Sequence, residues 1–534
     1  MTAQASIRPY LNQAYFIGLL MVAVGLTLSP FLMGMSQFWL VLVWLVDVLT
    51  SCRHCEQACK SPVFKAKLSR FWNNKAAVLL VAFYLMHVVG LLWTSDFQYA
   101  MKDLRVKLPI LVMPFVLSSM EPLDRKRADL LLNVYVLSVF MATWFSFAAY
   151  VKHDYEDVRE ISRFISHIRF CLHIVFSIAI VGYYLVTRKS LLWSKIVQVL
   201  LLLWFGYQIF IFESLSGYVI LAVVVVVSVV YVFLRRKKGR GWRIAIAVSF
   251  GIVLLVGTVF LVQKIKPLVK VEKVDFNMLD KTTAQGNWYW HDTVCNPVED
   301  GKYVGLYYCK EEMQEAWSER SPLPFDGNTL NGENLEATLA RYLTSKDLRK
   351  DAEGVSALTD DDIHNVEQGV ANYNNWRHPG LRARISVTLF EYNMYRRFNN
   401  PNGGSLSQRI EFTRASFHLI RQHPLFGVGT GDVPQAFRRA YDEIHSPLRE
   451  EFRFRAHNQY LAITVAFGVV GLALFLVALF YPYLSSKKNR TYLMTIFLCI
   501  MLLSMFPEDT LETQAGTSMF AFFYSFLLFV RPKS

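Results

Sequence analysis

Charged residues are scarce in this chain. They make up 18% of its 534 residues, whereas about 25% is usual in soluble domains. Hydrophobic residues make up 53% of the chain, and the sequence has no internal repeat and no low-complexity segment. These features exclude a soluble globular enzyme, a disordered chain and a fibrous repeat protein.

Cysteine is also rare, with seven residues, which is too few for a disulfide scaffold. The segment from Cys52 to Cys59 has one CxxC spacing but no second pair, so we expect free thiols there and no metal site. The sequence does not decide whether Cys295 and Cys309 form a disulfide. No small-residue cleavage site follows the first apolar run, which we therefore expect to be a retained helix.

Long apolar runs are what the chain has in abundance, and about 18–20 apolar residues suffice to cross a bilayer as a helix. We therefore predict an all-α polytopic membrane protein with about twelve transmembrane helices. The predicted spans cover about 14–33, 36–50, 76–94, 106–119, 129–150, 170–187, 190–211, 214–234, 242–263, 457–484, 491–507 and 513–530.

The loops between these spans alternate in charge. Seven alternate segments together hold 24 basic and three acidic residues; they are 1–13, 51–75, 120–128, 188–196, 235–243, 485–490 and 531–534. The positive-inside rule places all seven, and both termini, in the cytoplasm. The net charge of +14 is thus a signal of topology, and we expect no nucleic-acid partner.

One hydrophilic loop, 264–456, is far longer than the others. We therefore divide the chain into nine helices in 1–263, this predicted periplasmic loop, and three helices in 457–534. Within the loop, 268–376 is an acidic insert, whereas 377–456 has 13 Arg and no Lys. Arg grips phosphate through a planar fork, so 377–456 is the expected catalytic part; an Arg-rich contact with anionic headgroups is the alternative.

Three local patterns in 377–456 and just beyond carry chemistry. After the breaker Asn402-Gly403-Gly404, a helix is predicted with Ser407 as N-cap, and it ends before His423-Pro424. A glycine-spaced turn follows, in which the amides of Gly429 and Gly431 could cradle an anion, although such loops often only turn the chain. His457 and Asn458 then lead into the tenth span, where a histidine can accept a proton near neutral pH.

These motifs, in this order, resemble the signature of the O-antigen ligase family: an Arg-bearing helix from Ser405, the turn Pro424-Leu425-Phe426-Gly427-Val428-Gly429-Thr430-Gly431, and His457-Asn458-Gln459-Tyr460-Leu461 opening a membrane helix that contains glycine. The motifs cover about 405–475, and the predicted layout of spans extends the agreement to most of the chain. The acidic insert is not part of the general pattern.

The resemblance implies a fold like that of type C glycosyltransferases. It also implies an inverting glycosyltransferase without metal or cofactor. Such an enzyme transfers polysaccharide from undecaprenyl pyrophosphate to lipid A–core at the periplasmic face of the bacterial inner membrane. Arg409 matches the arginine that engages the pyrophosphate, and His457 matches the base for the acceptor hydroxyl. Arg414 lies on the same helix, with a less defined role.

Further candidates for substrate binding lie at the same predicted face. Some relatives carry a Ser-Arg-Gly element that 214–217 lacks, and Arg169 is a nearby replacement. Arg105 belongs to a basic cluster with Lys102 and Lys107. The carboxylates of Glu508, Asp509 and Glu512, between the last two spans, could orient His457, bind the acceptor or act as the base, or they could be solvated and inert.

Within the same superfamily, an O-antigen polymerase and a protein O-oligosaccharyltransferase are the alternatives. A transporter of lipid-linked glycans is a weaker hypothesis, because it predicts inverted repeats and charges along the spans. A receptor or scaffold would explain the acidic insert but not the Arg-only segment.

Overall fold

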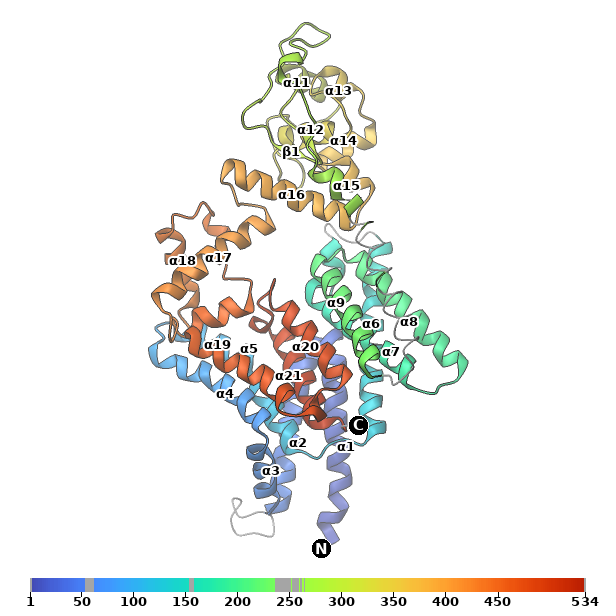
Figure 1. Cartoon of the computed structure of the whole chain (residues 1–534), viewed down its shortest axis with the longest axis vertical. Coiled ribbons are helices and arrows are strands. Elements are labelled where there is room, and N and C mark those ends of the chain that lie inside the picture. Colours follow the sequence, from blue (N-terminus) through green and yellow to red (C-terminus); the bar gives the residue numbers. More distant parts are fainter. Residues whose placement is uncertain are drawn as a thin grey trace. The chain divides into compact units, whose positions relative to one another are not determined.

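The computed structural model describes residues 2–52, 62–152, 158–235, 251, 259, 262–263 and 265–532, and most of them are helical (Figure 1). The chain forms two compact units. The first, here the membrane unit, comprises Met1–Lys237, Phe412–Ser446 and Arg453–Ser534; the second, here the insert unit, comprises Lys238–Glu411 and Pro447–Phe452.

Most of the membrane unit is built from long apolar helices. In chain order, the helices and short helical turns of this unit are α1 (Thr2–Leu28), α2 (Pro30–Cys52), α3 (Pro62–Asn73), α4 (Lys75–Val89), η2 (Gly90–Trp93), α5 (Phe97–Ser119), α6 (Arg125–Val151), η3 (Val158–Ile161), α7 (His167–Thr187), α8 (Leu192–Ile211), α9 (Leu215–Arg235), α18 (Val433–Glu443), α19 (Gln459–Ser485), η6 (Lys487–Asn489), α20 (Tyr492–Ser504), η7 (Thr510–Glu512), α21 (Gln514–Ser525) and η8 (Phe526–Val530).

Among the described residues, eight helices are long and apolar enough to cross a membrane: α1, α2, α4 with η2, α6, α7, α8, α9 and α19. The last two predicted spans coincide with shorter apolar helices, α20 and α21 with η8. The fourth coincides with α5, whose first half is charged, and 242–263 lies almost wholly outside the described residues. A helical membrane protein is thus confirmed, whereas the count of twelve spans stays a prediction.

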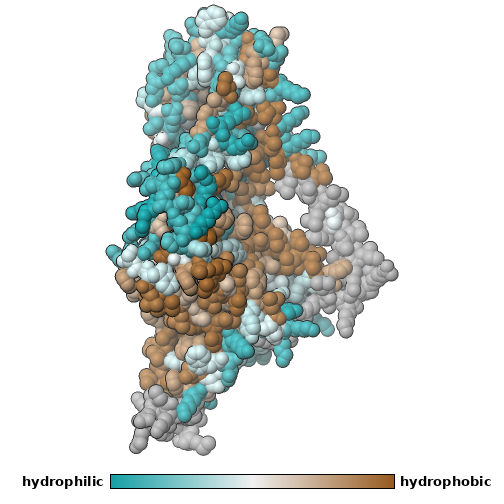
Figure 2. Space-filling model, turned by 60° about the vertical axis from the view of Figure 1, so that its left-hand side comes forward, coloured by the Kyte–Doolittle hydropathy of each residue, from teal (hydrophilic) through white to brown (hydrophobic). Residues whose placement is uncertain are grey.

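Hydrophobic side chains also cover much of the surface of these helices (Figure 2). Leu92 is 83% exposed, Phe31 77% and Leu192 75%. Exposed apolar area on this scale is unfavourable in water and suits lipid contact.

The insert unit has its own core and secondary structure. Its elements are η4 (Phe276–Met278), the antiparallel pair β1 (Val298–Glu299) and β2 (Lys302–Tyr303), α11 (Lys310–Ser318), α12 (Leu335–Ser345), α13 (Ala352–Ser356), α14 (Asp360–Glu367), α15 (Tyr373–Arg377), α16 (Leu381–Phe398) and η5 (Glu450–Phe452). Trp317 and Tyr342 are fully buried in its core. Cys295 and Cys309 are both free thiols, so the disulfide left open by the sequence is not formed.

Helix α19 is interrupted at Gly468, where the backbone leaves the helical region (φ 62°, ψ −165°). The glycine turn before α18 occupies the break. The amides of Val428 and Gly429 donate to the carbonyls of Val465 and Ala466 at 2.9 Å, and Val469 N donates to Pro424 O at 2.9 Å. The broken helix thus keeps its polar backbone groups paired, which a helix at membrane depth requires.

Substitution of Gly468 by alanine is expected to destabilise this joint. Almost no residue except glycine adopts these φ and ψ values, and the conformation costs any other residue about 1–3 kcal/mol. An added Cβ would also lie 2.2 Å from the carbonyl of Leu425. The melting temperature of the purified protein in detergent measures the loss. Gly182→Ala is the control, because nothing lies within 4 Å of that Cβ; equal melting of the two variants would contradict the expectation.

Candidate active site

His457 lies immediately before α19, and its side chain is about one third exposed. Its backbone has a positive φ of 42°, a conformation that non-glycine residues rarely adopt and that is found preferentially at functional sites. The rings of Phe412 and Phe454 flank the imidazole, with centroids 5.4 and 6.2 Å away. These contacts hold the ring at the mouth of the helix.

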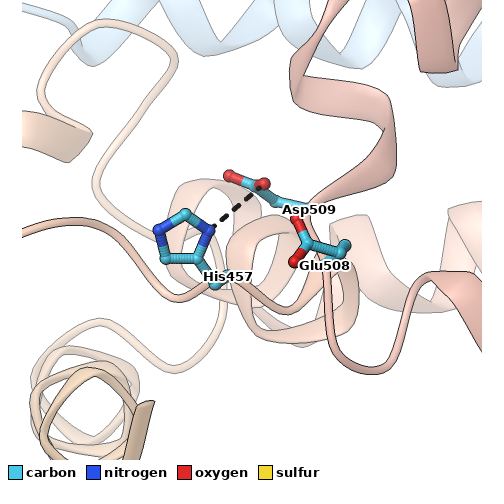
Figure 3. Close-up of side chains that lie close together, drawn as sticks. All are labelled: His457, Glu508 and Asp509. Carbon is cyan, nitrogen blue, oxygen red and sulfur yellow. Dashed lines mark ion pairs between the residues drawn. The ribbon is translucent and has the colours of Figure 1, made fainter. Parts of the chain in front are cut away.

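A buried carboxylate faces this histidine. Asp509 Oδ1 lies 3.7 Å from His457 Nδ1 (Figure 3). That distance is too long for a hydrogen bond, and His457 Nδ1 has no hydrogen-bond partner among the described residues. The separation still suits electrostatic stabilisation of a protonated imidazole. Of the carboxylates in 507–512 that the sequence allowed for this role, Asp509 is thus the one that faces His457.

Asn458 secures the start of α19. Its Oδ1 accepts from the backbone amide of Leu461 at 3.0 Å, and its Nδ2 donates to Phe506 O at 2.8 Å. The first contact is an N-cap, and the second ties the helix to the loop that carries Asp509. The geometry therefore favours a positioning role for Asn458, and the predicted contact with substrate stays a prediction.

A network of buried charges lies behind the histidine. Glu512 Oε2 accepts from Lys107 Nζ at 2.8 Å and from Arg455 Nη1 at 2.9 Å, and Gln459 Nε2 donates to Oε1 at 3.2 Å. Lys107 also pairs with Asp103 on the same helix.

Arg455 extends this network to the histidine's partner. Its Nε lies 3.4 Å from Asp509 Oδ2, and its Nη1 donates to Tyr99 OH at 3.0 Å. The arginine therefore links Glu512 to Asp509, the carboxylate that faces His457. The cavity beside this network measures only about 20 Å³, which leaves room for about one water.

The cations set the protonation state of Glu512. Burial alone would raise the pKa of its carboxyl, but Lys107 and Arg455 outweigh it and hold that pKa well below its usual range. Burial alone would lower the pKa of Arg455. The carboxylates of Glu512 and, to a smaller extent, Asp509 outweigh burial and raise that pKa above its ordinary value. Both groups are therefore charged at neutral pH, and together they fix the position of Asp509.

The glycine turn packs against the protein. Gly429 N donates to Ala466 O, and Gly431 N donates to Thr94 Oγ1 at 3.2 Å. At its end, Asp432 accepts from the amides of Ser95 and Asp96 at 2.9 Å. Because these amides already have protein acceptors, the geometry favours a role in packing for Gly429 and Gly431. Their binding of an anion stays a prediction.

Helix α17 (Ser405–Gln422) carries the matched arginines and runs from the insert unit into the membrane unit. It begins two residues before the predicted N-cap, so Ser407 lies in its first turn and its hydroxyl points to Gly404 O at 3.4 Å. The helix ends at Gln422, as the sequence predicted. Arg409 is half-buried and Arg414 is exposed.

The other predicted arginines differ in their surroundings. Arg169 lies in the first turn of α7, and its Nε is buried without a hydrogen-bond partner among the described residues. Arg105 is exposed on α5, whereas its neighbour Lys107 is 3% exposed and bound to Glu512. Of the predicted basic cluster, the structure therefore brings Lys107 into the network behind His457.

Sequence reasoning missed several members of this site. The buried residues Asp103 and Gln459 and the half-buried Tyr99 were not singled out for it. One available signal was the spacing of Asp103 and Lys107, an i, i+4 pair of opposite charges on one helix face.

Three side chains of the site could hold a metal ion. The ligand atoms of His457, Glu508 and Asp509 all lie within 4.8 Å of one another. The guanidinium of Arg455, however, already supplies a positive charge beside Asp509. This pairing favours an ion-pair network over a metal centre.

The fold and site define a helical membrane protein with a histidine and a buried carboxylate at the mouth of a spanning helix. The family model described as O-Antigen ligase matches residues 380–476, which include Arg409, the glycine turn and His457. This segment is therefore similar to the O-antigen ligase family, and the resemblance seen in the sequence is confirmed. No curated protein matches the chain.

Proposed function

We propose that the protein is an O-antigen ligase. It transfers polysaccharide from undecaprenyl pyrophosphate to lipid A–core at the periplasmic face of the inner membrane. The observation that carries the proposal is His457, facing Asp509 at the mouth of α19 within the matched segment. The eight apolar helices support a site at a membrane surface, where a lipid-linked donor and a lipid acceptor can meet.

The proposed reaction is a single displacement. The acceptor hydroxyl oxygen attacks the anomeric carbon, the bond from that carbon to the pyrophosphate oxygen breaks, and the anomeric centre inverts. His457 takes the hydroxyl proton on Nε2, because Nδ1 faces Asp509, and the carboxylate stabilises the imidazolium that forms. Undecaprenyl pyrophosphate leaves as an anion.

Arginine is assigned to the leaving group. A guanidinium fork binds phosphate oxygens bidentately and stabilises charge as it develops. Arg409 is the proposed pyrophosphate ligand. Arg169, with its unpartnered Nε, is proposed as a second contact, and Arg414 and Arg105 as weaker ones.

A gel of lipopolysaccharide from cells that lack the gene, complemented with wild type or with Arg409→Ala, tests the proposal. Wild type should restore the polysaccharide ladder. With the variant, the ladder should be lost while lipid-linked polymer accumulates. A ladder shortened to one repeat unit would instead indicate a polymerase. An unchanged ladder with unmodified glycoproteins would indicate a protein O-oligosaccharyltransferase, and polymer accumulating on the cytoplasmic side would indicate a transporter.

Chelation should leave the reaction unchanged. Because cationic side chains already neutralise the carboxylates of the site, purified protein treated with EDTA is expected to keep its rate of glycan transfer in a metal-free assay. Magnesium added back should have no effect. Loss of activity with EDTA and recovery with a divalent ion would show instead that His457, Glu508 and Asp509 bind metal.

A further inference from the structure

A second cavity lies at the opposite end of α19 from His457. Its volume is about 190 Å³. It is formed where α6 and α20 begin and where α7, α9 and η8 end. Its charged lining residues are Arg125, Asp129, Lys487, Lys488, Arg490 and Arg531.

Positive charge dominates this cavity. Five of its lining residues are Lys or Arg, and Asp129 is the one acid among them. Asp129 is already neutralised, since it forms an ion pair with Arg188 and accepts a hydrogen bond from Tyr184 OH at 3.0 Å.

Most of these cations have no carboxylate partner among the described residues. Within the described part of the chain, no carboxylate forms an ion pair with Arg125, Lys487, Lys488 or Arg531. Clustering four such cations around a cavity is unfavourable unless an anion joins them. The cavity is therefore suited to an anionic ligand.

Aromatic side chains form one wall and hold one of the cations. The rings of Tyr183 and Tyr492 stack with centroids 5.4 Å apart, and the Arg531 guanidinium lies 5.6 Å from the Tyr183 ring centroid. Thr491 caps the amino end of α20 by accepting from Met494 N. The positive end of that helix dipole therefore also faces the cavity.

The location indicates the source of the anion. The cavity lies at the ends of helices that are long and apolar enough to cross a membrane. Helix ends of this kind are where lipid headgroups are expected and where tyrosines are enriched. Three of the seven basic segments predicted to be cytoplasmic contribute residues to it: 120–128, 485–490 and 531–534. Basic pockets between membrane helices on that side bind the headgroups of anionic lipids.

We propose that this cavity is a binding site for the phosphate headgroup of an anionic phospholipid, held by Lys487, Lys488 and Arg531. The site is separate from His457 and is independent of the proposed transfer reaction. Arg125 and the amino end of α20 complete the positive surround.

Native mass spectrometry of the full-length protein in detergent, titrated with phosphatidylglycerol or phosphatidylcholine, tests the site. Each charge-assisted contact is worth about 1.5–3 kcal/mol, that is, about tenfold or more in affinity. Wild type should bind phosphatidylglycerol at least about tenfold more tightly than phosphatidylcholine. The variant Lys487→Gln/Lys488→Gln/Arg531→Gln should lose this preference. If that variant does not fold, the double variant Lys487→Gln/Lys488→Gln, at two exposed positions, replaces it.

The matched control is Lys65→Gln/Lys126→Gln/Lys189→Gln. It removes three exposed charges from segments predicted to lie on the same side, none of which lines the cavity. It should keep the preference for phosphatidylglycerol. Equal loss of the preference in the cavity variant and in this control would show that lipid is attracted to surface charge alone. Unchanged binding in the cavity variant would exclude the site. Displacement of the lipid by potassium phosphate, with equal stabilisation by phosphate alone, would show a site for free phosphate and overturn the lipid assignment.

Discussion

His457→Ala is expected to lower the rate of glycan transfer by about 10²–10⁴-fold, the usual contribution of a positioned general base. The alanine leaves Asp509 and the charge network in place, so the substrates should still bind while proton removal fails. An assay of purified protein with lipid-linked polysaccharide and lipid A–core measures the rate. The fall should appear in kcat more than in KM.

His364→Ala is the matched control for this experiment. His364 belongs to the insert unit, where its exposed ring lies 3.8 Å from Glu367, and its loss should leave the rate unchanged. Melting temperatures of both variants should match that of wild type, which separates a chemical defect from misfolding. A His457→Ala protein that folds and retains its rate would remove the histidine from the mechanism, and the base would then have to be sought among the neighbouring carboxylates.

The sequence revealed the parts of this protein that depend on neighbouring residues. The apolar runs predicted the helices because crossing a bilayer demands one length and one composition. The motif at His457 could be found for a similar reason. Its histidine, its capping asparagine and the helix that follows are consecutive, and the cap at Asn458 formed as local hydrogen bonding dictates.

The network behind the histidine depends on contacts that sequence spacing cannot reveal. Lys107 and Glu512 are 405 positions apart, yet their charged groups lie 2.8 Å from each other. Which of Arg105 and Lys107 is buried depends on which face of α5 packs against the loop before α21. A helix rotates by about 200° over two residues, so one of the two cations is buried and the other is exposed.

The glycine turn shows a different limit. Spacing identified a turn with accessible amides, but not the acceptors that those amides would meet. The break in α19 at Gly468 leaves backbone groups without helical partners, and the turn supplies them. Glycine is required at Gly427 because a Cβ there would lie 2.4 Å from the backbone of Ala466. Close packing explains these glycines without reference to a ligand.

Lys107→Met is the second change with a large expected effect, and here the effect is on stability. The substitution leaves Asp103 without its cation and Glu512 with Arg455 alone in a buried site. Removal of one partner of a buried ion pair costs about 3–5 kcal/mol, because the remaining charge stays desolvated. The melting temperature of the purified protein in detergent should fall accordingly. Lys102→Met, on the exposed side of the same helix, should leave it unchanged.

The pH dependence of this loss tests its electrostatic origin. In wild type the pKa of Glu512 lies below its ordinary value of 4.5. The ion pair therefore stabilises the fold above that pH, and its contribution is lost as the pH falls toward the folded pKa. In Lys107→Met, protonation of the carboxylates at low pH instead removes the unpaired buried charge. The gap in melting temperature between the two proteins should thus be widest near neutral pH and narrow on acidification.

A double-mutant cycle with Glu512→Gln distinguishes the lost pair from lost packing. If the cost of Lys107→Met comes from an unpaired carboxylate, then Lys107→Met/Glu512→Gln should be more stable than the sum of the two single losses predicts. The neutral amide of glutamine keeps one acceptor oxygen for Gln459 or Arg455 and needs no second cation. Strict additivity, together with a gap that does not change with pH, would mean that Lys107 acts through its aliphatic chain. The position of Asp509 beside His457 would then not depend on this charge network.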